Sequence, residues 1–221
     1  MTTTHSSKTH EGIRAILNPR SIAFIGASDD VAKWGGVLLH VLRKFNYPGA
    51  VYPVNPKAES IQGLRAYARV GDIGQPIDLA VISIGVDGVE QAMRECAAAG
   101  VRAAMVVTSQ FAESGPEGAQ KQERVLATAR QAGIAMIGPN CMGVLNANES
   151  MVLLNSTALV EFFDDIPRGR IGLVSQSGAV VGAMIARAGF VGAGFSSCVS
   201  LGNQADLEIC DFFDYLVDDP N

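Results

Sequence analysis

Short, almost uninterrupted apolar runs recur along this chain, and each is followed by a glycine or a polar turn. The first five runs are expected to be strands, over 21–25, 50–54, 78–84, 103–108 and 134–137. Apolar residues occupy both faces of these runs instead of alternating, which is typical of strands covered on both sides. Helical spacing between them predicts right-handed βαβ units, so the fold class is α/β with a Rossmann-type doubly wound parallel sheet.

The pattern divides the chain into successive parts. Helices are expected over 37–45, 88–99 and 117–131 of a Rossmann-type domain that extends over 13–145. The polar residues 1–12 are expected to be a disordered tail, and a short helix over 11–17 should end before Pro19. Residues 146–168 show no regular pattern and are expected to be a connection.

A second α/β unit is expected over 169–221. Its strands should lie at 171–174 and 195–199, and its helices at 178–188 and 206–217. Two strands and two helices cannot bury a two-sided sheet by themselves. This unit is therefore expected to be the first part of a flavodoxin-like domain, or to dock on another structure and otherwise expose an unfinished sheet edge.

Composition and charge exclude several classes of function. The net charge of −5 provides no general field that would attract nucleic acid or an anionic membrane. The polar start lacks the apolar core of a secretory signal, and no apolar run reaches the length of about 18 residues that a membrane span needs. The four cysteines show no metal-binding or disulfide spacing. We expect a reduced, cytoplasmic protein without a metal site and without nucleic-acid or membrane partners.

The strongest indication of a site is the polarity of the strand ends. In an open α/β sheet the ligand lies beyond the carboxyl ends of the strands. Small, polar or turn-forming residues follow all five apolar runs: Gly26-Ala27-Ser28, Asn55-Pro56-Lys57, Gly85-Val86-Asp87, Ser109 to Glu113, and Gly138-Pro139-Asn140. A ligand site at this edge of the sheet is therefore expected.

Two of these strand ends indicate a phosphate-bearing ligand. Gly26 lacks a Cβ, so the backbone can approach a diphosphate, and the following helix start favours an anion. The alternative is an ordinary strand–helix turn, because the full G-x-G-x-x-G motif is absent. Lys57 stands where NAD-binding domains usually carry an acidic residue, and it suits the extra ribose phosphate of coenzyme A (CoA) or NADP. The alternative for Lys57 is a solvated lysine after a turn.

A second candidate site lies in the segment Val174-Ser175-Gln176-Ser177-Gly178. It follows a strand and opens a helix, so backbone N–H groups and two hydroxyls can surround an anion. The alternative is simple capping of the helix by Ser177. Cys141 is expected to be a packed thiol, and Asp206 part of a solvated helix face.

Together these motifs resemble the CoA-binding part of the NDP-forming acyl-CoA synthetases. That superfamily includes ADP-forming acetate–CoA ligase and the α subunit of succinyl-CoA synthetase, and protein lysine acyltransferases carry the same module. The similar segments lie at 21–28, 51–57, 78–82, 111–113, 138–143, 174–178 and 200–206. The resemblance extends from about residue 13 to Asn221.

The resemblance implies a role for each candidate residue. CoA would bind in the first domain, with phosphates near Gly26, Ala27, Ser28 and Lys57. Its pocket would include Asn55, Pro56, Ile84, Phe111, Glu113, Pro139 and Asn140. The helix start at Ser175, Ser177 and Gly178 would hold the phosphate of a phosphohistidine, which carries the phosphoryl group between a nucleotide site and the acyl site.

The sequence departs from the family pattern in two respects. Ser109-Gln110 stands where the family more often has Ser/Thr-Ala-Gly, which affects contacts in the pocket. None of the three histidines occupies the phosphohistidine motif, so that histidine is expected beyond Asn221. No catalytic residue is therefore expected in residues 1–221, and the ATP and magnesium sites of an ATP-grasp part are expected elsewhere.

These departures leave several functions open. The first is the CoA-binding portion of an acid–thiol ligase, active with a missing C-terminal part or β subunit in a homo- or hetero-oligomer. The second is a non-catalytic CoA-binding regulatory module, such as that of a lysine acyltransferase. The third is an NADP-dependent oxidoreductase, which fits Lys57 but for which no hydride-transfer site is recognisable.

Overall fold

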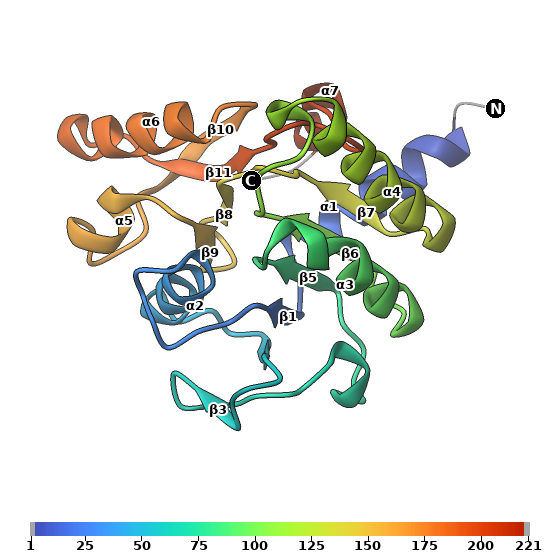
Figure 1. The fold of residues 1–221 in the computed structure, drawn as a ribbon. Coiled ribbons are helices and arrows are strands. Elements are labelled where there is room, and N and C mark those ends of the chain that lie inside the picture. Colours follow the sequence, from blue (N-terminus) through green and yellow to red (C-terminus); the bar gives the residue numbers. More distant parts are fainter. Residues whose placement is uncertain (1–2, 219–221) are drawn as a thin grey trace.

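The computed structural model describes residues 3–218, and side-chain surroundings from residue 7 onward. Its first domain is a five-stranded sheet in the order β2-β1-β5-β6-β7, parallel throughout (Figure 1). The strands are β1 (Ser21–Ile25), β2 (Ala50–Val54), β5 (Leu79–Ile82), β6 (Ala103–Val106) and β7 (Ala135–Ile137). The expected class and all five strands are confirmed. The direction of winding reverses between β1 and β5, which is where such sheets bind ligands.

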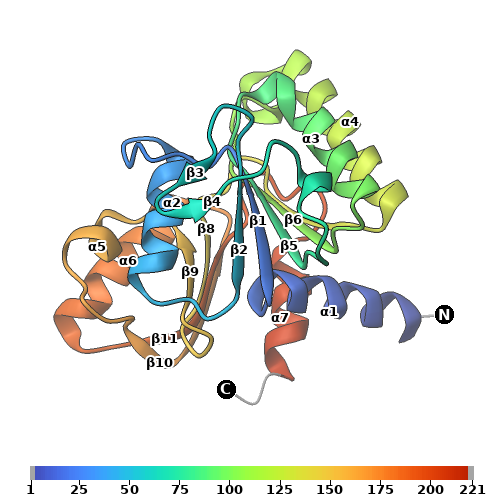
Figure 2. The same ribbon diagram turned by 90° about the horizontal axis from the view of Figure 1, so that it is seen from below.

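Helices cover both faces of this sheet, so its strands are buried on both sides (Figure 2). On one face, α1 (Thr3–Leu17) and α2 (Trp34–Lys44) pack in the same core as Ile22 and Phe24 of β1. On the other, α3 (Val86–Ala98) and α4 (Pro116–Ala132) pack in the same core as Ala23 and Ile25. Successive residues of β1 thus enter different cores, which explains why the run is continuously apolar.

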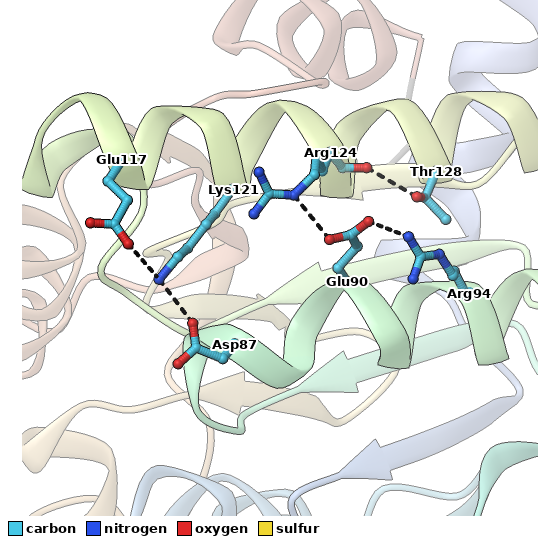
Figure 3. A network of polar contacts seen from close by, with 7 residues as sticks. All are labelled: Asp87, Glu90, Arg94, Glu117, Lys121, Arg124 and Thr128. Atoms are coloured by element: carbon cyan, nitrogen blue, oxygen red, sulfur yellow. Dashed lines mark hydrogen bonds and ion pairs between the residues drawn. The ribbon is translucent and has the colours of Figure 1, made fainter.

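Surface ion pairs join α3 and α4 (Figure 3). The Lys121 Nζ lies 2.8 Å from the Asp87 Oδ1, and the Arg124 Nε lies 3.1 Å from the Glu90 Oε2. Arg94 also pairs with Glu90. The hydrogen bond from Lys121 lowers the pKa of the Asp87 carboxyl. Because solvent screens such pairs, they align the two helices more than they stabilise the fold.

The second sheet contains four strands in the order β10-β11-β8-β9. They are β8 (Gly143–Asn146), β9 (Met151–Leu154), β10 (Arg168–Ser175) and β11 (Phe195–Ser200). The expected strands at 171–174 and 195–199 are confirmed as β10 and β11, which pair in parallel. The helices of this unit are α5 (Thr157–Glu161), α6 (Gly178–Val191) and α7 (Ile209–Val217).

The expected extent of this second unit is described only in part. The sequence predicts that the unit continues to Asn221, but Asn221 and the two residues before it lie outside the described residues. The prediction of a phosphohistidine beyond Asn221 likewise falls outside them and stays a prediction. The described part of the second unit therefore ends at Asp218.

The prediction that 146–168 is an irregular connection was wrong. An antiparallel hairpin, β8–β9, and the helix α5 occupy most of this segment, and β8 pairs with β11. Each hairpin strand is only four residues long, which is too short for periodicity to distinguish it from a loop. The hairpin raises the number of strands in this sheet from two to four, and its side chains pack with Val41 of α2 and with Phe45, which follows that helix.

The expected disorder over residues 1–12 is also not what the structure shows. Helix α1 is continuous from Thr3 to Leu17, and only Met1 and Thr2 of the expected tail lie outside the described residues. His10 makes an edge-to-face ring contact with Tyr215 of α7, with centroids 5.5 Å apart. Helix α1 therefore joins the two units (Figure 2), a tertiary contact that its polar sequence does not predict.

Short elements complete the described chain: the hairpin β3 (Ser60–Ile61) with β4 (Leu64–Arg65), and the 3₁₀ turns η1 (Val70–Asp72) and η2 (Ala112–Ser114). Among the described residues, no helix combines the length and the apolar character that crossing a membrane would require.

Candidate functional site

A cleft of about 750 Å³ lies at the carboxyl edge of the first sheet, where the second unit meets it. Its lining comes from 26, 33–35, 83–86, 107–110, 140–142, 176–179 and 202. These positions follow β1, β5, β6, β7, β10 and β11 and include the starts of α2 and α6. The structure thus joins the strand ends and the Ser177 segment, the two candidate sites of the sequence, in one cavity.

Gly26 lines the cleft, and its backbone is closely packed there. Its φ is +88°, and a Cβ there would lie 2.2 Å from the Ser83 carbonyl oxygen. A Cβ on Gly35, at the start of α2, would lie 2.0 Å from the Gly26 oxygen. The Gly26 N–H already donates to the Val54 oxygen, 3.1 Å away. Glycine at position 26 therefore allows close packing where the winding reverses between β1 and β5. A phosphate in the cleft would have to accept hydrogen bonds from donors other than the Gly26 N–H.

The remaining residues of the first two strand ends lie beside the cleft, outside its lining. Ala27 is fully buried, and its oxygen accepts a hydrogen bond of 3.0 Å from the Asn55 Nδ2. The Asn55 Oδ1 accepts from the Lys57 N–H at 2.9 Å. Asn55 thus ties the two loops together, while Lys57 and Pro56 are exposed. Contact of these residues with phosphate stays a prediction.

Gln62 is a structural residue that the sequence did not reveal. Its Nε2 donates to the oxygens of Ser28 and Gly36, at 3.0 and 2.9 Å. Its backbone N–H donates to the Asp29 Oδ1 at 2.6 Å. The β3–β4 turn thereby fixes the loop between β1 and α2 that borders the cleft.

Lys33 is the only charged residue among the described residues that line the cleft. Its Nζ lies 3.5 Å from the Asp30 Oδ2, in an exposed pair. Trp34 follows it, is 44% exposed and also lines the cleft. Nothing in the sequence favoured Lys33 over Lys57, because only the folded loop shows which lysine reaches the cleft.

The strand ends after β5, β6 and β7 contribute both lining and support. Ile84 and Asn140 line the cleft, whereas Phe111, Glu113 and Pro139 do not. Phe111 is fully buried in the core that includes α3 and α4. The Thr108 hydroxyl donates to the Ile84 oxygen at 2.7 Å, and this hydrogen bond links the loop after β6 to the loop after β5.

Glu113 contributes to the cleft indirectly, through hydrogen bonds to the backbone of the loop that lines it. Its Oε1 accepts from the N–H groups of Gln110 and Phe111, at 2.6 and 3.2 Å. Its Oε2 accepts from the Asn203 Nδ2 at 2.6 Å. Burial opposes the charged carboxylate, but these hydrogen bonds outweigh it and lower the pKa of Glu113. The ionised Glu113 thus fixes the conformation of Gln110, which lines the cleft.

The segment after β11 passes between the two units. Backbone N–H groups of Gly202 and Asn203 donate to the oxygens of Gln176 and Pro139, at 3.1 and 2.9 Å. Asp206 accepts from the Met136 N–H and the Arg130 Nε, both at 3.1 Å. The prediction that Asp206 lies on a solvated helix face was therefore wrong, because α7 begins only at Ile209.

The start of α6 is both capped and open to the cleft. The Ser177 Oγ accepts from the Val180 N–H at 3.4 Å, and the Ser175 Oγ accepts from the Ser177 N–H at 3.1 Å. Gln176, Ser177 and Gly178 line the cleft, so the positive end of the helix dipole faces it. Capping and anion binding, which the sequence left as alternatives, are compatible here.

Cys141 lies in the lining but is not a reactive thiol. Its side chain is buried, and its Sγ donates to the Val106 oxygen at 3.3 Å. Burial raises the pKa of the thiol to about 12. The expectation of a packed cysteine is confirmed.

Comparisons with known proteins give two family matches. Residues 20–147 match the CoA binding domain, and residues 168–221 match the succinyl-CoA ligase like flavodoxin domain. The α subunit of ADP-forming acetate–CoA ligase II of Pyrococcus furiosus is 37% identical over 202 residues, 91% of this chain and 42% of that protein. An ADP-forming acetate–CoA ligase of Methanocaldococcus jannaschii is 37% identical over 94% of this chain and 28% of its own length.

A solved structure has the same fold. The apo form of dinucleotide-forming acetyl-coenzyme A synthetase 1 of Ca. Korarchaeum cryptofilum superposes with a TM-score of 0.88 at 35% identity. The match covers 95% of this chain and 44% of that one. The chain thus spans less than half the length of these relatives.

Proposed function

Since the chain belongs to the CoA-binding domain family and continues into a succinyl-CoA-ligase-like flavodoxin domain, we propose that it is the CoA-binding portion of an ADP-forming acyl-CoA synthetase. Such an acid–thiol ligase joins a carboxylic acid to CoA and converts ATP to ADP and phosphate. The observation that carries the proposal is the single cleft that unites the carboxyl edge of the CoA-binding sheet with the start of α6.

The chemistry of the cleft fits CoA. The ligand carries a phosphorylated nucleotide at one end and a long amide-containing arm that ends in a thiol. Lys33 and the start of α2 provide positive charge near β1, and no carboxylate lies among the described lining residues. Ile84, Val107 and Met142 provide apolar surface for the arm. Lys57 is proposed to contact the ribose phosphate from outside the cleft, where it is exposed.

The start of α6 is proposed to hold a phosphoryl group. Its uncompensated N–H groups and the Ser177 hydroxyl favour an oxyanion at the cleft. The phosphohistidine that would deliver this group, and the sites for ATP and magnesium, are proposed to belong to parts of the ligase beyond Asn221 or on a partner subunit. The role of this chain is then to bind CoA and to position its thiol near the phosphoryl site.

A partner subunit or further domain is proposed to cover part of the second unit. Strand β10 is at the edge of its sheet, and Ile171 on it is about half exposed. Helix α6 exposes Met184, Phe190 and Val191, and Phe162 after α5 is also exposed. An apolar surface of this kind is typical of an interface. The free thiols fit a reducing compartment, so we also propose a cytoplasmic location.

Calorimetric titration of the chain with CoA tests the proposal, with NADP and NAD as controls. We expect saturable binding of CoA and much weaker binding of both nicotinamide nucleotides. Preference of the folded chain for NADP would favour an oxidoreductase instead. An acetyltransferase domain in the complete protein, without the phosphohistidine, would favour the regulatory module.

A further inference from the structure

The order of the strands gives the cleft two chemically different ends. Lys33 and Trp34 stand near the end of β1, and Gln110 follows β6, which is two positions away in the sheet. The only charge among the described lining residues is at the β1 end, so the phosphates of a ligand are expected there. The thiol end of CoA would then lie toward β6 and β7, where Gly178 of α6 approaches Met142.

Gln110 has an unusual backbone conformation at this end. Its φ is +74°, a region that favours glycine and is uncommon for other residues. The Glu113 carboxylate holds the Gln110 N–H at 2.6 Å and thus supports the conformation. Such conformations cost free energy and concentrate at functional sites.

Two other glutamines with positive φ provide a comparison. In Gln62 the side-chain amide donates to the oxygens of Ser28 and Gly36, and in Gln204 it accepts from the Ile209 N–H. Gln110 lines the cleft and is exposed, and its carboxamide has no hydrogen-bond partner among the described residues. Hydrogen bonds within the structure therefore account for the Gln62 and Gln204 side chains, whereas the Gln110 amide remains available to a ligand.

We propose that the Gln110 carboxamide recognises a hydroxyl group on the acyl chain, so that the substrates are short hydroxy-substituted carboxylic acids. The inference rests on the proposed function, because it requires CoA in this cleft with its thiol near β6. An amide can both donate to and accept from a hydroxyl. A second carboxylate on the acyl chain would meet no cation at this end among the described lining residues, because Lys33 lies at the other.

Calorimetric titration of the chain with butyryl-CoA and with 3- and 4-hydroxybutyryl-CoA tests the inference. Each hydroxylated ligand differs from butyryl-CoA by one oxygen. We expect at least one to bind roughly two- to tenfold more tightly, the range that one neutral hydrogen bond gives. Gln110→Gly and Gln110→Ala should abolish this preference, so that butyryl-CoA and the two hydroxylated ligands bind with equal affinity.

Two further variants complete the design. Gln110→Asn retains an amide and tolerates positive φ, so it should remain folded while its shorter side chain weakens the preference. Gln131→Ala, at an exposed position on α4, should behave as the wild type.

Each contrary result has a distinct meaning. Equal binding of all acyl-CoAs, with CoA still bound, would overturn the role of Gln110 and leave the proposed function standing. A loss of affinity for CoA itself in Gln110→Gly would assign the amide to the pantetheine arm instead. Absence of CoA binding to the folded chain would overturn both proposals.

Discussion

Replacement of Gly26 by alanine tests whether the first strand end is shaped by close packing. The left-handed φ of +88° costs an alanine about 1–2 kcal/mol. The new Cβ would also lie 2.2 Å from the Ser83 oxygen and 2.7 Å from the Ile84 Cγ2. Overpacking of this kind costs roughly 1–3 kcal/mol more. We expect Gly26→Ala to lower the free energy of unfolding by about 2–5 kcal/mol in total.

Gly63 provides the matched control. Its φ is +77°, and a Cβ there would meet nothing within 4 Å. Gly63→Ala should therefore lower the free energy of unfolding only by the cost of the left-handed conformation, about 1–2 kcal/mol. Urea unfolding followed by circular dichroism gives both values on one scale. Equal losses in the two variants would refute the argument that contact with the Ser83 loop requires glycine at position 26.

Three further predictions concern other parts of the molecule. Asp206→Ala leaves the buried Met136 N–H without its acceptor and should lower the free energy of unfolding by about 1–3 kcal/mol, whereas the exposed Asp214→Ala should change it by less than about 0.5 kcal/mol. A thiol reagent should modify one cysteine per native chain, Cys210, and four after denaturation, because burial raises the pKa of the other three thiols to about 12; fast labelling of two or more native thiols would contradict this. Lys57→Ala should weaken the binding of CoA more than the binding of dephospho-CoA, by roughly the 1.5–3 kcal/mol of a charged hydrogen bond. Equal losses of affinity for the two ligands would assign Lys57 another role.

The sequence was most informative where a residue's environment depends on neighbours along the chain. The five strands of the first sheet were predictable because each is buried on both faces and appears as an apolar run. Polar strand ends predicted the edge at which the cleft lies. Ile84 and Asn140, two of the residues predicted to contact CoA, line this cleft, and their contact with CoA stays a prediction.

The features that the sequence missed depend on contacts between distant segments. The β8–β9 hairpin is recognisable only through its pairing with β11, and α1 through its contact with α7. The resemblance predicts that Glu113 contacts the ligand, which stays a prediction; the hydrogen bonds that its carboxylate accepts from Gln110 and Asn203 could not be read from the sequence. Lys33 could not be distinguished from other exposed lysines until the loop between β1 and α2 was folded.

The central claim is that CoA binds in the cleft between the first sheet and α6. Trp34 is the single tryptophan of the chain and lines this cleft, so its fluorescence reports binding there without a label. Titration with CoA, excited at the red edge of tryptophan absorption, should give a saturable change with the same dissociation constant as calorimetry. Binding of CoA that calorimetry detects but that leaves the emission of Trp34 unchanged would contradict the account.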